Sequence, residues 1–256
     1  MSDKAKSRLM IAGAALCAAL FLFSGAMLAR EYLDQKQSAE AFAEVADLVK
    51  EDVEPPTLEL ADDSAPEPEE LTAFEKYADV YAQNSDLVGW ITVPGTRIDY
   101  PVMQTKDNPN FYLKHAFDQS YSSYGVPYMQ ENCDIGISDN LVLYGHHMKN
   151  GSMFKDISRY KDQGYFDQHS EIILYTPERE IHLKALAAVC TSPDAIRRKT
   201  EFASGEEFAS YIQQMTAGAS ASAPIEGTIV RLYSFVTCSY EFNNARTILY
   251  AYEAAE

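Results

Sequence analysis

The sequence predicts a mainly β domain, an antiparallel barrel or sandwich, that follows a single membrane-spanning helix. The first observation is an uncharged, mostly apolar run over residues 9–29. The second is a series of short segments rich in Val, Ile, Tyr and Thr, at 88–93, 98–103, 141–144, 171–175, 181–190, 228–236 and 246–252. Many short strands with few helices between them are typical of all-β folds.

The apolar run over residues 9–29 is long enough to cross a bilayer, which takes about 20 helical residues. Basic residues precede the run and acidic residues dominate after it. Because an excess of Lys and Arg keeps its end in the cytoplasm, residues 1–8 are expected to be a cytoplasmic tail and the rest of the chain to be extracellular. A cleaved signal peptide is the alternative, but its apolar region is usually only about 7 to 15 residues long.

Residues 30–71 are expected to connect this anchor to the folded domain. Apolar side chains recur at helical spacing at Phe42, Val45, Ala46 and Val49. This stripe predicts an amphipathic helix that needs a surface to pack on. Residues 51–70 hold nine acidic residues and four prolines. Their composition favours a solvated spacer, with an ordered acidic face as the alternative.

The remaining residues, 72–256, are enough for one domain with a sizeable core. The chain of 256 residues carries 38 acidic and 21 basic residues, a net charge of -17. A field of that sign repels nucleic-acid phosphates, so nucleic acid is excluded as a partner.

Three helices are expected within this domain. Thr72 and Glu75 have the spacing of a capping box at the start of the first helix. A second helix is expected near Ser152. The third is expected near Ser204, where Ser204 and Glu207 form another capping box.

Three of the four cysteines lie outside the apolar run, and an odd number in an extracellular domain indicates a free thiol. Cys190 ends an apolar run and is expected to be a small buried residue. Cys238 directly follows the strand expected at 228–236, and Arg246 opens the next strand after a loop of seven residues, SYEFNNA.

If these two strands pair as a hairpin, the Cys238 thiol and the Arg246 guanidinium meet at one rim. A nearby fixed cation favours the thiolate, which is the nucleophilic form of cysteine. Arg246 also suits an oxyanion, because its planar group stays protonated and donates several hydrogen bonds. An inert cysteine at a strand end is the alternative interpretation.

His146 lies in the segment Tyr144-Gly145-His146-His147, which also follows a short apolar strand. Histidine is the usual proton carrier near neutral pH, so Cys238 and His146 form a candidate nucleophile and acid. The two histidines could instead bind a metal ion. Adjacent residues of a strand point to opposite faces, however, so no metal site is expected.

Three segments of the chain closely resemble class B sortases. They are residues 86–102, residues 144–154 and the segment Thr237-Cys-Ser-Tyr-Glu-Phe242 followed by Arg246. The resemblance covers residues 72 to 254. It implies an eight-stranded sortase barrel with N-terminal helices and an extra helix before the cysteine strand, here at 204–216. It also implies Cys238 as nucleophile, His146 as general acid and base, and Arg246 as the group that stabilises the oxyanion.

The resemblance further implies a cysteine transpeptidase that needs neither metal nor organic cofactor. Such an enzyme cleaves a C-terminal sorting signal of a secreted protein after threonine and forms a thioester. It then transfers the acyl group to an amine of a peptidoglycan precursor or cross-bridge. A pilin-polymerising sortase and a non-catalytic wall-binding barrel are the alternatives. One position departs from the family, since Val236 stands where a serine is common.

Overall fold

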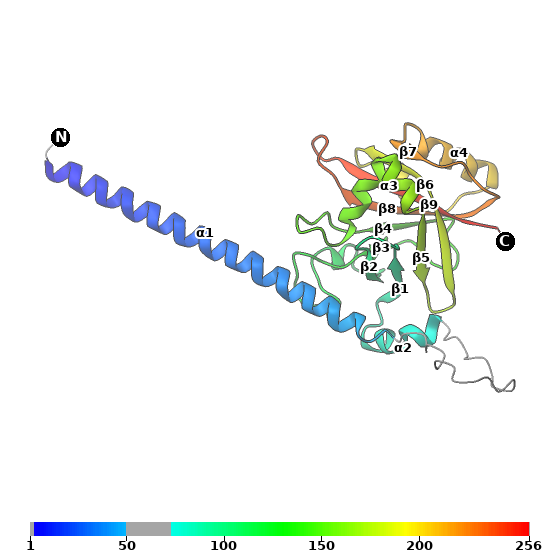
Figure 1. The fold of residues 1–256 in the computed structure, drawn as a ribbon, viewed down its shortest axis with the longest axis horizontal. Coiled ribbons are helices and arrows are strands. Elements are labelled where there is room, and N and C mark those ends of the chain that lie inside the picture. Colours follow the sequence, from blue (N-terminus) through cyan, green and yellow to red (C-terminus); the bar gives the residue numbers. More distant parts are fainter. Residues whose placement is uncertain (1–2, 50–72, 256) are drawn as a thin grey trace, which may run out of the picture.

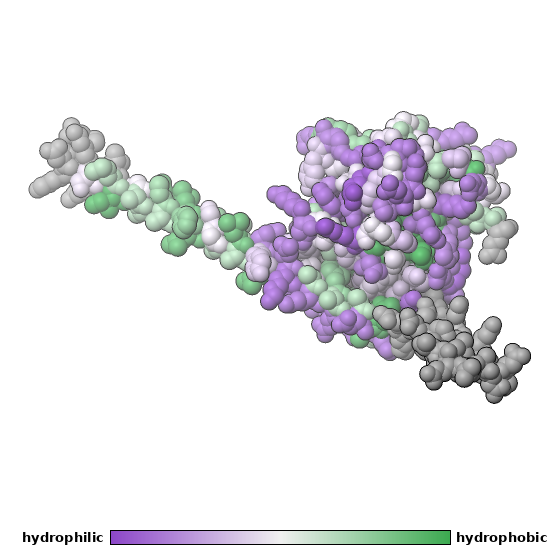
Figure 2. All heavy atoms as spheres, viewed as in Figure 1, coloured by the Kyte–Doolittle hydropathy of each residue, from purple (hydrophilic) through white to green (hydrophobic). Residues whose placement is uncertain are grey.

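The computed structural model describes residues 3–49 and 73–255. The expected acidic spacer over 51–70, and Thr72 of the first expected capping box, lie outside the described residues. Helix α1 (Asp3–Ala46) extends away from a compact β domain (Figure 1). It is the one helix among the described residues that is long and apolar enough to cross a membrane, and none of its most apolar stretch is buried. Figure 2 shows this hydrophobic surface along α1.

The last three turns of α1 pack against the β domain. The ring of Phe42 lies edge-on to Tyr100 with their centroids 5.3 Å apart, and Val45 is buried. Nearer the apolar stretch of α1, the carboxylate of Asp34 accepts hydrogen bonds from the backbone N–H and the hydroxyl of Ser123. The expected amphipathic helix is therefore confirmed for Phe42 and Val45, and it continues the apolar helix without a break, but Ala46 is exposed and Val49 lies beyond the helix end.

Nine strands form the sheet in the described part of the chain. They are β1 (Leu87–Thr92), β2 (Asp99–Met103), β3 (Tyr128–Met129), β4 (Asn140–Tyr144), β5 (Glu171–Tyr175), β6 (Glu180–Thr191), β7 (Ala221–Ser222), β8 (Ile229–Cys238) and β9 (Arg246–Ala254). Their order is β5-β1-β2-β3-β4-β8-β9-β6-β7, and a further pairing of β5 with β6 closes eight of them into a barrel. The ninth, β7, pairs with β6.

Most neighbouring strands are antiparallel, as the sequence predicts, but two pairs are parallel: β2 with β3, and β4 with β8. A parallel pair needs a long connection between its strands. Residues 145–228 provide one between β4 and β8, and residues 104–127 provide the other. The two-residue strands β3 and β7 were not expected from the sequence, since they are too short to show an alternating pattern.

Six short helices lie outside the sheet within residues 73–255: α2 (Ala73–Gln83), η1 (Phe111–Leu113), η2 (Phe154–Lys161), α3 (Gln163–Gln168), η3 (Ala195–Arg198) and α4 (Gly205–Thr216). The helix expected near Ser152 is the 3₁₀ helix η2. Its buried side chains Phe154, Ile157 and Tyr160 recur every three residues, which is the period of a 3₁₀ helix.

Helix α4 is the expected extra helix before the strand that ends at Cys238. The backbone N–H of Glu207 donates to the hydroxyl of Ser204 at 3.2 Å, as a capping box requires. The carboxylate of Glu207 accepts from the N–H of Ala203 at 2.8 Å. Tyr211, Ile212 and Met215 form its buried face.

The barrel interior is the main hydrophobic core. Ile91, Leu141, Leu143, Phe235 and Leu249 are all fully buried in it. Each fully buried aliphatic or aromatic side chain contributes about 1.5–3 kcal/mol to folding. This core fixes strands β4, β8 and β9, whose ends carry the candidate site.

Candidate active site

Three strand ends meet at one rim of the barrel. Strands β4 and β8 run parallel, with Tyr144 paired to Val236, so the residues that follow β4 lie beside the end of β8. Strands β8 and β9 are antiparallel, and Cys238 is paired with Arg246. His146 lies just after β4, Cys238 at the end of β8 and Arg246 at the start of β9, so the three residues lie at the same end of the sheet.

The expected hairpin between β8 and β9 is confirmed, with residues 239–245 as its loop. The N–H of Ser239 donates to the Ala245 carbonyl at 3.0 Å, and the N–H of Ala245 donates to the Phe242 carbonyl at 3.2 Å. The first bond continues the ladder by one residue beyond Cys238, and the second closes a turn within the loop. The tip of the loop carries the exposed rings of Tyr240 and Phe242.

A cavity of about 470 Å³ at this rim is lined by His146, Cys238 and Arg246 together. Its apolar wall includes Val142, Val236 and Ile248, and its polar wall includes two further arginines, Arg197 and Arg198. Three arginines outnumber the one acidic residue of this lining, Asp194, so the cavity wall is net basic in a chain whose net charge is -17. Such a cavity favours carbonyl oxygens and developing negative charge.

A larger groove of about 630 Å³ lies on strands β5 and β6 and the end of β9. Two ion pairs lie in it, Lys184 with Glu226 at 2.6 Å and Arg179 with Glu253 at 2.6 Å. Two further carboxylates, those of Glu171 and Glu180, contact the ring of His182. None of the three expected residues lines this groove. We therefore place the candidate site in the smaller cavity, where a thiol is present.

The cysteines differ in what surrounds them. Cys133 is buried, and burial raises the pKa of its thiol to about 11, so it stays protonated near neutral pH. Cys190 was expected to be buried but is half-buried. It lies near the end of β6, beside the β8–β9 loop. Its thiol lies 3.4 Å from the carboxylate of Glu241. Cys238 is a free, half-buried thiol that opens into the cavity.

The His146 imidazole is held by the loop that contains η1. Its Nε2 donates a hydrogen bond to the Leu113 carbonyl at 2.8 Å. Burial lowers the pKa of His146 below its usual 6.5, and the nearby Lys114 ammonium lowers it further, while the bond to the carbonyl acts in the opposite direction. Near pH 7 the resting imidazole is therefore mostly neutral.

Gly145 fixes the turn that presents His146. A Cβ atom at this position would lie 2.4 Å from the ring of Phe154, so only glycine fits without displacing that ring. The carbonyl of Gly145 accepts a hydrogen bond of 2.8 Å from the hydroxyl of Thr237, the residue before Cys238. The backbone on both sides of the site is thus tied together.

The Arg246 guanidinium is half-buried and oriented by its own loop. Its Nη1 donates to the carbonyls of Asn244 at 3.3 Å and Ala245 at 3.0 Å. Because the guanidinium carries five N–H donors, these two bonds leave donors for a further acceptor. The side chain is therefore pre-oriented beside Cys238.

His147 lies on the other side of the backbone from His146, as expected for neighbouring residues of an extended segment. Its Nδ1 donates to the carbonyl of Cys238 at 2.7 Å, and its Nε2 accepts from the Lys155 ammonium at 2.7 Å. The two histidine rings have different partners.

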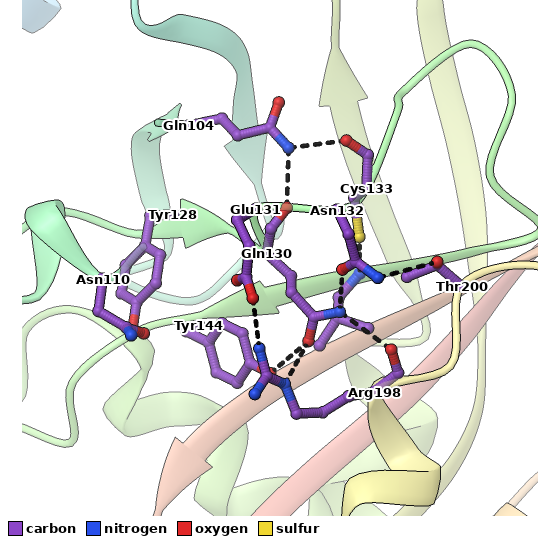
Figure 3. Close-up of polar contacts among 11 residues, drawn as sticks. Gln104, Asn110, Tyr128, Gln130, Glu131, Asn132, Cys133, Tyr144, Arg198 and Thr200 are labelled. Atoms are coloured by element: carbon purple, nitrogen blue, oxygen red, sulfur yellow. Dashed lines mark hydrogen bonds and ion pairs between the residues drawn. The ribbon is translucent and has the colours of Figure 1, made fainter. Parts of the chain in front are cut away.

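A polar network beside the cavity was not found from the sequence (Figure 3). Arg198 donates to Gln130 at 2.8 Å and to Glu131 at 2.9 Å, and the hydroxyl of Tyr144 also donates to Gln130, at 2.8 Å. The network ties η3 to the β3–β4 segment. The adjacent basic pair Arg197-Arg198 was the only signal of it in the sequence, since its acidic and amide partners are far away along the chain.

The protein is thus a closed β-barrel with a cavity at its rim. A thiol, an imidazole and a guanidinium line this cavity and form a site centred on a cysteine. The sortase domain family matches residues 91–254. The chain therefore belongs to the sortase family.

Similar proteins include several class B sortases. Sortase B of Listeria monocytogenes is 31% identical over 142 residues, which are 55% of this chain and 57% of that relative's length. Sortase B of Staphylococcus aureus is 25% identical over 172 residues, 66% of this chain and 70% of that protein. The X-ray structure of Clostridium perfringens sortase B is 28% identical with a TM-score of 0.65, and the match covers 70% of this chain and 99% of that one. The chain thus spans a little over half the length of the Listeria relative.

Proposed function

We propose that this protein is a membrane-anchored cysteine transpeptidase that cleaves a C-terminal sorting signal of secreted proteins after threonine. Cys238 is its nucleophile, His146 its general acid and base, and Arg246 its oxyanion donor. The observation that carries the proposal is the single cavity that all three side chains line. The membership of the chain in the sortase family supports it further.

In the first half-reaction, the Cys238 thiolate attacks the carbonyl carbon of the threonine and a tetrahedral oxyanion forms. Arg246 donates hydrogen bonds to this oxyanion. When the intermediate collapses, the C–N bond breaks and protonated His146 gives its proton to the leaving amine. The product is a thioester between threonine and Cys238.

In the second half-reaction, the amine of a peptidoglycan precursor or cross-bridge attacks the thioester carbonyl. The now neutral His146 accepts the proton of the attacking amine. The C–S bond breaks, the thiolate is restored and a new amide remains. The sum of the two steps exchanges one amide for another, so the reaction needs no oxidant or reductant.

His146 delivers this proton from Nδ1. Its Nε2–H is donated to the Leu113 carbonyl, so Nδ1 is the nitrogen left to carry the transferable proton. The lowered pKa of the imidazole makes its protonated form a strong acid toward a leaving amine. Because the resting imidazole is neutral, transfer of the Cys238 thiol proton to it forms the thiolate and the imidazolium that the first half-reaction uses. Loss of that proton to the leaving amine restores the neutral form that the second half-reaction requires.

The proposed topology puts residues 1–8 in the cytoplasm, residues 9–29 in the membrane and residues 72–256 outside the cell, after the connecting residues 30–71. The apolar helix and the basic residues before it support this orientation. Both proposed substrates are presented at the outer membrane surface. An anchored enzyme meets them there at high local concentration.

The test is cleavage of fluorescent sorting-signal peptides by the full-length chain in detergent micelles, with and without an added amine acceptor. The parent should cleave a peptide after its threonine and, with acceptor, yield the ligated product. Cys238→Ala should be inactive, while Cys190→Ala, which removes a half-buried thiol outside the cavity, should behave as the parent does. Equal cleavage by Cys238→Ala and the parent would refute the proposal.

A further inference from the structure

The ring of His147 is held at both nitrogens by two different segments. Nδ1 contacts the carbonyl of Cys238 at 2.7 Å, and Nε2 contacts Nζ of Lys155, from helix η2, also at 2.7 Å. The ring of Tyr240 stands edge-on to it, with centroids 5.1 Å apart. The imidazole is therefore clamped between η2 and the first residues after β8.

These partners determine the protonation state of the ring. A carbonyl oxygen can only accept a hydrogen bond, so Nδ1 carries a proton. A lysine ammonium can only donate, so Nε2 presents its lone pair. His147 is thus the neutral Nδ1–H tautomer.

The charges around His147 support this state. Lys155 and Lys161, both on η2, face the ring, and Glu241 of the β8–β9 loop is ion-paired with Lys161. Burial lowers the pKa of His147 most, and the two lysines lower it further, against the opposing effect of the bond to the Cys238 carbonyl. The ring therefore stays neutral near pH 7 and does not serve as a proton carrier.

The start of η2 holds both halves of the site. The N–H of Phe154 donates to the His146 carbonyl at 2.9 Å, and the Phe154 ring lies against Gly145. The next residue, Lys155, orients His147, which in turn binds the Cys238 carbonyl. Two consecutive residues of one helix thus fix the backbone of the proposed proton donor and, through His147, that of the proposed nucleophile.

We propose that His147 is a positioning residue: held by Lys155, its neutral ring fixes the carbonyl of Cys238 and thereby aims the thiol at the scissile carbonyl. This inference rests on the proposed function for its effect on turnover. Its structural content, the Lys155–His147–Cys238 chain of hydrogen bonds, does not depend on which peptide is the substrate.

The first test is the ¹⁵N spectrum of the histidine rings in the full-length chain, assigned with His147→Asn. The parent should show His147 as the Nδ1–H tautomer across pH 6 to 8. Lys155→Met removes the donor to Nε2 and one of the nearby cations, so the ring should titrate at higher pH than in the parent. A parent ring in the Nε2–H form, or no change in Lys155→Met, would overturn the proposal.

The second test compares variants in peptide turnover and in the rate of Cys238 alkylation by iodoacetamide. His147→Ala should lower kcat about 10- to 100-fold with little change in KM, because a misplaced nucleophile lowers reactivity more than binding. His147→Asn, whose amide N–H can replace Nδ1–H, should recover most of this loss. His169→Ala, which removes a similar bond of 3.1 Å to the Pro94 carbonyl away from the site, is the matched control.

A parent-like kcat and alkylation rate in His147→Ala would refute the positioning role. A kcat of His147→Asn no higher than that of His147→Ala would refute it as well. The two proposals can fail separately. If the parent cleaves no sorting-signal peptide, the proposed function is wrong, yet the tautomer and the alkylation rates still decide whether His147 positions Cys238.

Discussion

Cys238 and Arg246 are direct partners across the β8–β9 ladder, one as the last residue of its strand and the other as the first. The bond between Ser239 and the Ala245 carbonyl continues the pairing into the loop. The sheet therefore sets the separation of the two backbones, and the loop carbonyls of Asn244 and Ala245 orient the guanidinium.

Arg246→Ala should lower kcat about 10²- to 10³-fold, the usual cost of losing an oxyanion donor. Arg246→Lys should recover only part of the loss, because it keeps the charge but lacks the planar set of donors. Steady-state kinetics with one sorting-signal peptide would measure both. A kcat of Arg246→Ala within about threefold of the parent value would exclude the oxyanion role.

Gly145→Ala should destabilise the domain by about 1–3 kcal/mol, because the new methyl group overpacks the ring of Phe154. The displacement should also move His146 and lower kcat. Gly205→Ala is the control: a Cβ there has no neighbour within 4 Å, so its stability should stay within about 1 kcal/mol of the parent's. Thermal denaturation of both variants tests this, and equal melting temperatures would contradict the close approach of Phe154 to Gly145.

Lys114→Met should shift the alkaline limb of the pH–rate profile to higher pH. The Lys114 ammonium disfavours the imidazolium and so lowers the pKa of His146. Without it this pKa rises, and the protonated form that donates to the leaving amine persists to higher pH. The profile of kcat/KM between pH 5 and 10 is the measurement. A limb that stays in place, or moves to lower pH, would show that protonated His146 is not the group being observed.

Phe42→Ala should destabilise the barrel by about 1–3 kcal/mol, less than the roughly 3–5 kcal/mol of a fully buried ring, because Phe42 is half-buried. The loss follows from its contact with Tyr100, which ties α1 to the barrel. Glu44→Ala, at an exposed position on the same helix, should have little effect. Urea denaturation of the full-length variants measures both changes in stability. If α1 did not pack on the barrel, neither substitution would change the free energy of unfolding.

The long alternating segments and the capping residues could be predicted from the sequence. Strands such as β6 and β8 are long enough for their alternation of apolar and polar residues to be visible. Ser204 marks the start of α4, where its hydroxyl accepts a hydrogen bond from the N–H of Glu207. The two-residue strands could not be predicted, because they form only where a neighbouring strand supplies hydrogen-bond partners. The spacing of the apolar residues in η2 predicts a helix, but a spacing of three occurs in α-helices as well and does not reveal the 3₁₀ form.

The site was predicted in part. The position of Cys238 next to Arg246 follows from a short hairpin, which is a local feature. The position of His146 depends on β4 lying parallel to β8, with the long segment 145–228 between them, and no local pattern reveals such a pairing. For the same reason the partners of His147 and Arg198 were not found, since each lies on a different element.

Intact mass spectrometry of the full-length chain, quenched during cleavage of a sorting-signal peptide without acceptor, tests whether Cys238 forms a thioester with the substrate. We expect an adduct equal to the acyl fragment that ends in threonine, mapped to Cys238, absent from Cys238→Ala and released by an added amine. Cleavage without any adduct on Cys238, or an adduct on Cys133 or Cys190, would contradict this expectation.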